Sequence, residues 1–181
     1  MVLSHTAWGH DTVQVTHAPD GVATIVELQG NRISTLFAFG VIDTAERLEQ
    51  GDLLCRQSRN RHTVRAIVPK KYSHLRVNSP KKEVAGRWQL GFSTGDACRA
   101  LERVVTGEGS DVLAYTGPET TVTLELLKKK GDARLLLFGM KGSKPKELKY
   151  IATGPFRGPI RLPGRGLLQV DSLGPWSLTV H

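Results

Sequence analysis

The chain repeats its own sequence pattern, and this repeat limits the folds that it can adopt. The segment GHDTVQVT at 9–16 corresponds to GSDVLAYT at 109–116, and GRWQL at 86–90 corresponds to GPWSL at 174–178. The matched segments keep their order across nearly the whole chain of 181 residues. We interpret this pattern as an internal duplication of a unit of about 70 to 85 residues.

Each copy consists of short apolar segments that are separated by turn residues. The segments at 23–28 and 121–126 are rich in β-branched residues, as strands are. Each is followed by a turn and by a second apolar segment that ends in Phe-Gly, at Phe39 and at Phe138. Strand and turn signals at intervals of about 8 to 12 residues are typical of an antiparallel β-sandwich. We therefore expect an all-β chain made of two tandem antiparallel β-sandwich repeats.

One short helix is expected between the copies. Ala97, Leu101, Val104 and Val105 recur at helical spacing, and Thr94 or Asp96 can cap the first turn. Residues 1–8 are expected to be a loose leader. The predicted organisation is a leader over 1–8, a first repeat over 9–93, a helical linker over 94–108 and a second repeat over 109–181.

The second copy resembles a known class of domain. It has an Asp near its start, a Thr/Val strand, an apolar strand, then PGRGLLQV at 163–170 and GPWSLTV at 174–180. This order is similar to that of small bacterial jelly-roll accessory domains of the galactose-binding-like and pre-peptidase types. The resemblance covers residues 109–180 well and residues 9–90 less well. It implies two jelly-roll-like repeats that form a non-catalytic module, and it assigns no binding residue.

The aromatic residues at matched positions are expected to be structural. Trp88 and Trp176 occupy equivalent places in apolar strands, and Phe39 and Phe138 each end such a strand. An equivalent aromatic in each copy is most simply a core residue, so we expect all four to fill the interiors of the repeats.

Residues for metal binding or catalysis are scarce. Asp11 and Asp111 provide one carboxylate per copy, whereas calcium takes roughly six to eight oxygen ligands, so we expect these residues to cap turns. The six histidines follow no known metal-ligand spacing. The chain contains no nucleophile, phosphate-binding or dinucleotide motif. We therefore expect no enzymatic activity, no metal and no cofactor.

The N-terminus and the cysteines indicate a cytoplasmic protein. The first residues lack the basic start and apolar stretch of a secretory signal, and the longest apolar runs are far shorter than the roughly 20 residues of a membrane-spanning helix. Cys55 and Cys98 are too few for a disulfide framework and are expected to be free thiols. We expect no membrane partner.

The net charge of +8 is the one unusual feature of the composition. Such a charge favours anionic partners, namely nucleic acid, another polyanion or an acidic protein. Lysines at turns and edges also prevent sandwiches from pairing edge to edge, and only 6% of the residues are aromatic, fewer than a nucleic-acid groove usually carries. The candidate anion-binding residues are Arg56, Arg59, Arg61, Arg65, Lys70, Lys71, Lys128, Lys129 and Lys130.

The predicted function is that of a non-enzymatic binding or structural module. Because duplicated sandwiches with exposed edges commonly assemble with other chains, we expect a subunit or adaptor of a larger assembly, with another copy or another protein as partner. Two alternatives stay open. One is a basic protein that binds nucleic acid or another polyanion. The other is a carbohydrate-binding module, for which the candidate stacking residues are Trp8, Tyr72, Tyr115 and Tyr150.

Overall fold

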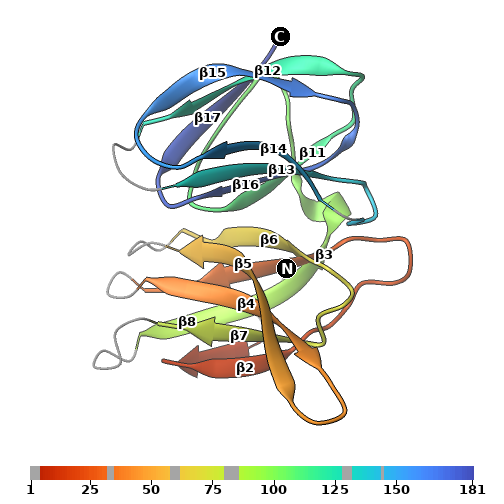
Figure 1. The fold of residues 1–181 in the computed structure, drawn as a ribbon, viewed down its shortest axis with the longest axis vertical. Helices are drawn as coiled ribbons and strands as arrows, with labels where there is room; N and C mark the ends of the chain where they lie inside the picture. The colour runs from red at the N-terminus through yellow and green to blue at the C-terminus, as the bar shows by residue number, and fades with distance from the viewer. Residues whose placement is uncertain (1–4, 32–34, 58–61, 80–85, 128–131, 144) are drawn as a thin grey trace.

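The computed structural model describes residues 5–31, 35–57, 62–79, 86–127, 132–143 and 145–181. Strands dominate this part of the chain, and its one helical element is the 3₁₀ turn η1 (Gly95–Ala97). The strands form four sheets, arranged in two halves that lie one above the other along the long axis of the molecule (Figure 1). The prediction of an all-β chain is confirmed.

The first half contains two four-stranded antiparallel sheets. Sheet A has, in spatial order, β1 (His5–Trp8), β8 (Arg87–Thr94), β3 (Thr24–Gln29) and β6 (Val64–Val68). Sheet B has β2 (Asp11–Gln14), β7 (His74–Asn78), β4 (Leu36–Asp43) and β5 (Leu48–Gln57). Apolar side chains from both sheets form one buried core between them, which explains the alternating pattern of the strands.

The second half contains sheets C and D. Sheet C has β14 (Lys146–Ile151), β13 (Ala133–Phe138), β16 (Gly166–Ser172), β11 (Asp111–Tyr115) and the short β9 (Arg99–Ala100), which pairs with β11 in parallel. Sheet D has β10 (Val104–Glu108), β17 (Pro175–Val180), β12 (Thr120–Leu126) and β15 (Phe156–Leu162). A second buried core lies between these sheets.

The two halves correspond strand by strand. With β9 set aside, β10 to β17 pair in the same order as β1 to β8, so that β5 and β6 correspond to β14 and β15. Sheet B has a bulge between β4 and β5, and sheet C has a bulge at the same place between β13 and β14. The bulged residues are Leu54 and Leu148, which both pack against the core of their own half.

The two tryptophans make the same contact in each half. Trp88 is 1% exposed and donates its indole N–H to the carbonyl of Gly9 at 2.9 Å, and Trp176 is 2% exposed and donates to the carbonyl of Gly109 at 2.8 Å. Both glycines have positive φ, at 68° and 80°, a conformation that favours glycine. The structure thus places both tryptophans in the cores, where they also fix the turn before the second strand.

The two phenylalanines lie elsewhere than expected. Phe39 is partly exposed on the outer face of sheet B, opposite Arg76. Phe138 is 4% exposed, but it belongs to a third apolar cluster, between the halves. The register also shows that Phe39 and Phe138 are not equivalent. Ala38 pairs with Val77 in sheet B, as Leu135 pairs with Val170 in sheet C. Phe39, which follows Ala38, therefore corresponds to Leu136.

The predicted leader and the predicted helical linker differ from the structure. Residues 5–8 are strand β1, which pairs with β8. Within 94–108, helical geometry is limited to the single turn η1, and it is followed by the strands β9 and β10. Leu101 and Val105 are buried in the core of the second half while Val104 is exposed, as alternation along a strand requires.

Candidate binding surface

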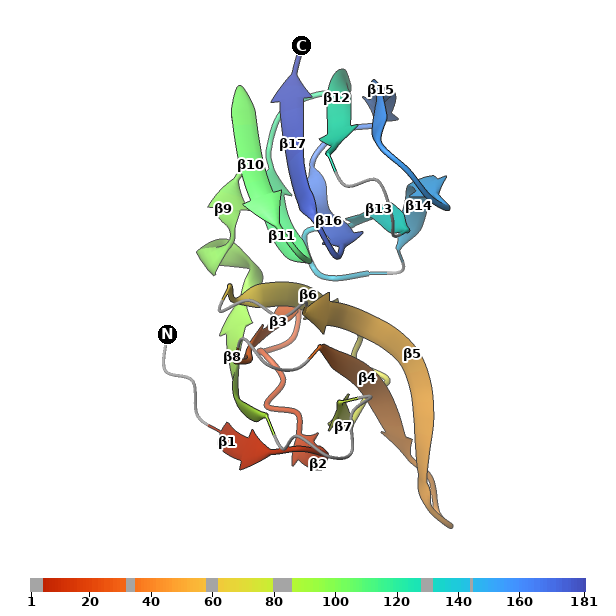
Figure 2. The ribbon, with the colours of Figure 1, turned by 90° about the vertical axis from the view of Figure 1, so that its left-hand side faces the viewer.

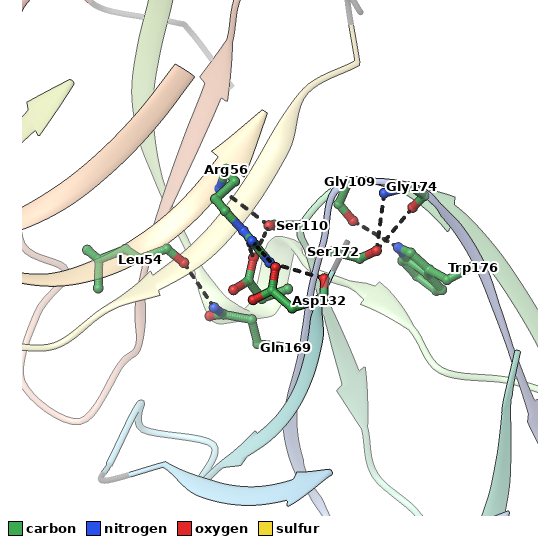
Figure 3. Close-up of polar contacts among 10 residues, drawn as sticks. Leu54, Arg56, Gly109, Ser110, Asp132, Gln169, Ser172, Gly174 and Trp176 are labelled. Carbon is green, nitrogen blue, oxygen red and sulfur yellow. Dashed lines mark hydrogen bonds and ion pairs between the residues drawn. The ribbon is translucent and has the colours of Figure 1, made fainter. Parts of the chain in front are cut away.

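The polar contact between the halves is centred on Arg56. This side chain extends from β5 and binds two carboxylates of the second half, with Nη1 2.5 Å from Asp132 Oδ1 and Nε 3.3 Å from Asp171 Oδ1 (Figure 3). Ser110 donates a further hydrogen bond to Asp171 at 2.9 Å. Burial opposes charge on Asp132, but the hydrogen bond and charge of Arg56 outweigh it and lower the pKa of this carboxyl. The charge of Arg56 is therefore used in ion pairs within the molecule and not in binding an external anion.

Arg65 forms a second ion-pair network across the same contact. Its Nη1 lies 3.3 Å from Asp111 Oδ1 in the second half, and its Nε lies 3.4 Å from Glu27 Oε1 in the first. Arg99 binds the other oxygen of Asp111 at 2.6 Å. The backbone N–H of Arg65 also donates to the carbonyl of Ser110 at 2.9 Å, which ties the edge of β6 to the second half.

Gln169 bridges sheets A and B of the first half where their outer strands β6 and β5 lie. Its side chain, which extends from β16, accepts a hydrogen bond from the N–H of Ile67 in β6 at 2.9 Å. It donates one to the carbonyl of Leu54 in β5 at 3.2 Å (Figure 3). Leu54 is the bulged residue, and a bulge leaves its residue out of the regular ladder. The gap between β5 and β6 therefore receives a side-chain amide from the neighbouring sheet face.

Apolar packing completes the contact. One buried cluster contains Ala23, Ile25 and Ile67 of the first half together with residues of β11, β13 and β16. The connection after β13 also reaches the first half, since a Cβ atom at Gly142 would lie only 3.1 Å from the Cβ of Ala23. The side of the first half where β5 and β6 lie, which we call the β5–β6 edge, thus packs on the outer face of sheet C.

Four of the nine predicted anion-binding residues lie within the described ranges, and each forms an ion pair. Arg56 and Arg65 lie in the contact between the halves, as described above. On the surface, Lys70 pairs with Asp20, and Lys71 pairs with Asp52 at 3.0 Å. Arg59, Arg61, Lys128, Lys129 and Lys130 lie outside the described residues.

Cations instead gather on an edge that the sequence did not single out. Lys146, Lys149, Arg157 and Arg161 are all exposed on β14 and β15, which correspond to β5 and β6. A groove of about 580 Å³ lies between these strands, and Leu148, Lys149 and Arg161 are among the residues that line it. We call this surface the β14–β15 edge. In the sequence these residues are separated by up to 15 positions, so only the two strands bring them together.

Some cations at or beside this edge make cation–π contacts with aromatic rings. Lys149 Nζ lies 5.3 Å from the centre of the Phe156 ring, and Arg134, on the neighbouring β13, lies 5.4 Å from that of Tyr150. Tyr150 is 48% exposed, whereas Tyr72 and Tyr115 are buried. Of the four aromatics considered for sugar stacking, only Trp8 and Tyr150 are accessible, and they lie in different halves. They therefore do not form a common platform.

Another cleft lies at the junction of the halves, with a volume of about 650 Å³, and Arg65, Arg99 and Asp111 are among its lining residues. Together with Glu27, which also pairs with Arg65, these side chains balance one another's charge through the ion pairs described above. Burial raises the pKa of the nearby Cys98 thiol to about 11, so this thiol stays protonated at neutral pH and is a weak nucleophile. Among the described residues, no group of three or more His, Cys, Asp or Glu is placed to hold a metal ion.

Comparison with known proteins yields no assignment. No model of a known protein family matches the chain, and no curated protein matches it either. In the part of the chain that the structure describes, no helix has the length and apolar character needed to cross a membrane.

Proposed function

We propose that this chain is a non-enzymatic binding and structural module that serves as a subunit or adaptor of a larger assembly. In this proposal each half is a jelly-roll β-sandwich, and the chain arose by duplication. The support for the jelly roll is the strand order, in which the first, eighth, third and sixth strands form one sheet and the second, seventh, fourth and fifth form the other, in both halves. The support for duplication is the shared bulge and the shared tryptophan–glycine bond.

The observation that carries the proposal is the exposed β14–β15 edge. Its counterpart, the β5–β6 edge, is covered by the outer face of sheet C, with both arginines paired and the gap filled by Gln169. The β14–β15 edge has a groove in the same place and retains a cationic surface. Lys149 and Pro159 on this edge also discourage indiscriminate strand pairing, so the edge favours a partner that brings complementary charge.

The test is site-specific photo-crosslinking in a lysate of the host. A photoreactive amino acid at Arg157, on β15, should give a discrete adduct with a partner chain. The matched control is Arg103, which is also exposed but lies beside β10, at the opposite edge of sheet D. Equal labelling at both positions, or a chain that stays monomeric at every concentration and gives no adduct, would refute the proposed function.

Binding of nucleic acid or another polyanion is the second candidate. The specific observation that favours it is the pairing of cations with aromatic rings at the β14–β15 edge, namely Lys149 with Phe156 and Arg134 with Tyr150. Titration with labelled single- and double-stranded oligonucleotides would decide. If four cations of the edge contact phosphates, log affinity should fall with log salt at a slope of about −3 to −4. Absence of binding at low salt would eliminate this function.

A further inference from the structure

The contact between the halves defines two surfaces, and each has a counterpart elsewhere in the same chain. The first half contributes its β5–β6 edge, whose counterpart is the β14–β15 edge. The second half contributes the outer face of sheet C and the connection after β13, whose counterparts are the outer face of sheet B and the β4–β5 hairpin. We infer that a second copy of this chain is the partner, so that the hairpin and sheet B of one copy dock on the β14–β15 edge of the next. This inference rests on the proposed function as an assembly subunit.

The β4–β5 hairpin is built as a protruding, ordered element. It extends away from the body of the first half (Figure 2), and its residues 43–52 are almost all exposed. Thr44 and Arg47 close its turn through a backbone hydrogen bond of 3.0 Å and two side-chain bonds. At its base the buried Tyr72 ring lies against Gly40 and Gly51, where any Cβ atom would come within 2.5 Å of the ring. The hairpin is therefore held in place rather than free to fold back.

The hairpin and the β14–β15 edge carry opposite charge. Within 43–52 the hairpin has four carboxylates and one guanidinium, although the chain as a whole has a net charge of +8. Within 146–161 the edge has four cations and one carboxylate. The two surfaces lie far apart in both views of the molecule, the hairpin at the lower end of the first half and β15 in the upper half (Figures 1 and 2). They can therefore meet only between two copies.

The hydrogen-bonding groups at the centre of the contact differ between the two surfaces. Gln169 corresponds to Arg76 by register, and Ile67 corresponds to Arg161 when the register is counted from the matched tryptophan strands β8 and β17. Gln169 accepts the N–H of Ile67 through its carbonyl oxygen, whereas arginine has no acceptor, so this hydrogen bond has no counterpart. Arg76 can still donate to the carbonyl of Leu148, as Gln169 does to that of its bulged counterpart.

The ion pair of Arg65 is not retained at the corresponding position. Arg65 binds Asp111 within the chain, and the corresponding residues are Pro159 on the edge and Asp11 on β2. Arg161, two residues further along β15, pairs with the exposed Glu119, so it can exchange partners at little cost. The apolar cluster of the internal contact is replaced here by polar residues such as Thr12 and His74. We therefore expect a contact that is weaker than the internal one and sensitive to salt.

The symmetry of the contact has a consequence for the assembly. Each copy offers a hairpin surface to one neighbour and an edge to another, so the contact is heterologous and propagates into an open row or a closed ring. In the intact protein, the mass measured by sedimentation should rise with concentration and fall with added sodium chloride. Glu46→Lys in the hairpin and Lys149→Glu on the edge should each weaken self-association by about tenfold or more, because like charges then face each other.

A mixture of the two variants tests the pairing itself. In an equimolar mixture of Glu46→Lys and Lys149→Glu, every hairpin again meets an edge of opposite charge, so association should return to near the wild-type level. The matched controls are Glu102→Lys and Arg103→Glu, which make the same charge changes at exposed positions outside both surfaces and should leave association unchanged.

The outcomes separate this inference from the proposed function. A wild-type chain that stays monomeric at all concentrations and low salt overturns the inference, and so does a mixture that fails to recover association. In either case, an adduct at Arg157 with a different protein would leave the function as an adaptor intact. If the edge instead binds a single-stranded oligonucleotide while the chain stays monomeric, the edge is a polyanion site and the second copy is not its partner.

Discussion

Replacement of Arg56 by Met should destabilise the fold far more than loss of an ordinary surface ion pair. The Arg56 side chain is 8% exposed, and the carboxylate of Asp171 beside it is 11% exposed. Of the two hydrogen bonds that Arg56 and Ser110 donate to the Asp171 carboxylate within the described ranges, Arg56→Met leaves the one from Ser110. Removing one partner of a buried ion pair typically costs about 3 to 5 kcal/mol, which is a large part of the roughly 5 to 15 kcal/mol that stabilises a typical domain.

The assay is urea-induced unfolding followed by circular dichroism. The matched control is Arg47→Met, which removes an ion pair with Glu49 whose side chains are 75% and 49% exposed, and it should cost no more than about 1 kcal/mol. The double variant Arg56→Met/Asp171→Asn should recover much of the loss, because it also removes the buried charge. If Arg56→Met unfolds at the same urea concentration as the control, the two halves are not joined in solution by the ion pair described above.

Two further predictions concern the paired tryptophans and the response to acid. Trp88→Phe and Trp176→Phe each remove one indole hydrogen bond to a glycine carbonyl, so both should lower the free energy of unfolding by similar amounts, about 1 to 3 kcal/mol, in the urea assay; a cost in one half alone would contradict their equivalence. The lowered pKa of Asp132 means that this carboxyl binds a proton less readily in the folded state than in the unfolded chain. The ionised Asp132 therefore contributes to the free energy of unfolding above about pH 4, and this contribution is lost as the pH falls through the lowered pKa. The urea midpoint should therefore drop in acid more steeply for the wild type than for Arg56→Met, and identical pH profiles would contradict this account.

The sequence predicted the strands well because strands depend on local patterns. Turn residues at regular intervals and β-branched segments indicate strands wherever the chain folds, and Trp88 and Trp176 marked equivalent positions. The match of Phe39 with Phe138 was wrong because the repeated Phe-Gly pair is a short coincidence. The sheet register aligns Phe39 with Leu136 instead, which lies two residues before Phe138.

The predicted linker helix was wrong for a related reason. Leu101, Val104 and Val105 fit a helical period, but so short a segment also fits two brief strands, and two of these three residues are β-branched. Pairing of β10 with β17 and burial of Leu101 in the core of the second half outweigh the local preference.

The candidate surface was the least predictable part. Arg56 looked like a free cation because its partners, Asp132 and Asp171, follow it by 76 and 115 residues. No local pattern reveals that such residues meet. The cations of the β14–β15 edge were visible in the sequence, but their shared surface depends on two strands that belong to different sheets.

The position of Gln169 has a consequence for synthesis of the chain. It follows Ile67 by 102 residues and Leu54 by 115. The N–H of Ile67 and the carbonyl of Leu54 therefore lack this hydrogen-bond partner until Gln169 has been synthesised. At about 5 to 20 residues per second, the ribosome needs roughly 5 to 20 seconds to make the intervening segment. During that interval the completed first half leaves the ribosome with its edge uncovered, and it can pair with the same edge of a neighbouring nascent chain. Translation speed over the second half is therefore expected to influence how much of the protein reaches its native state.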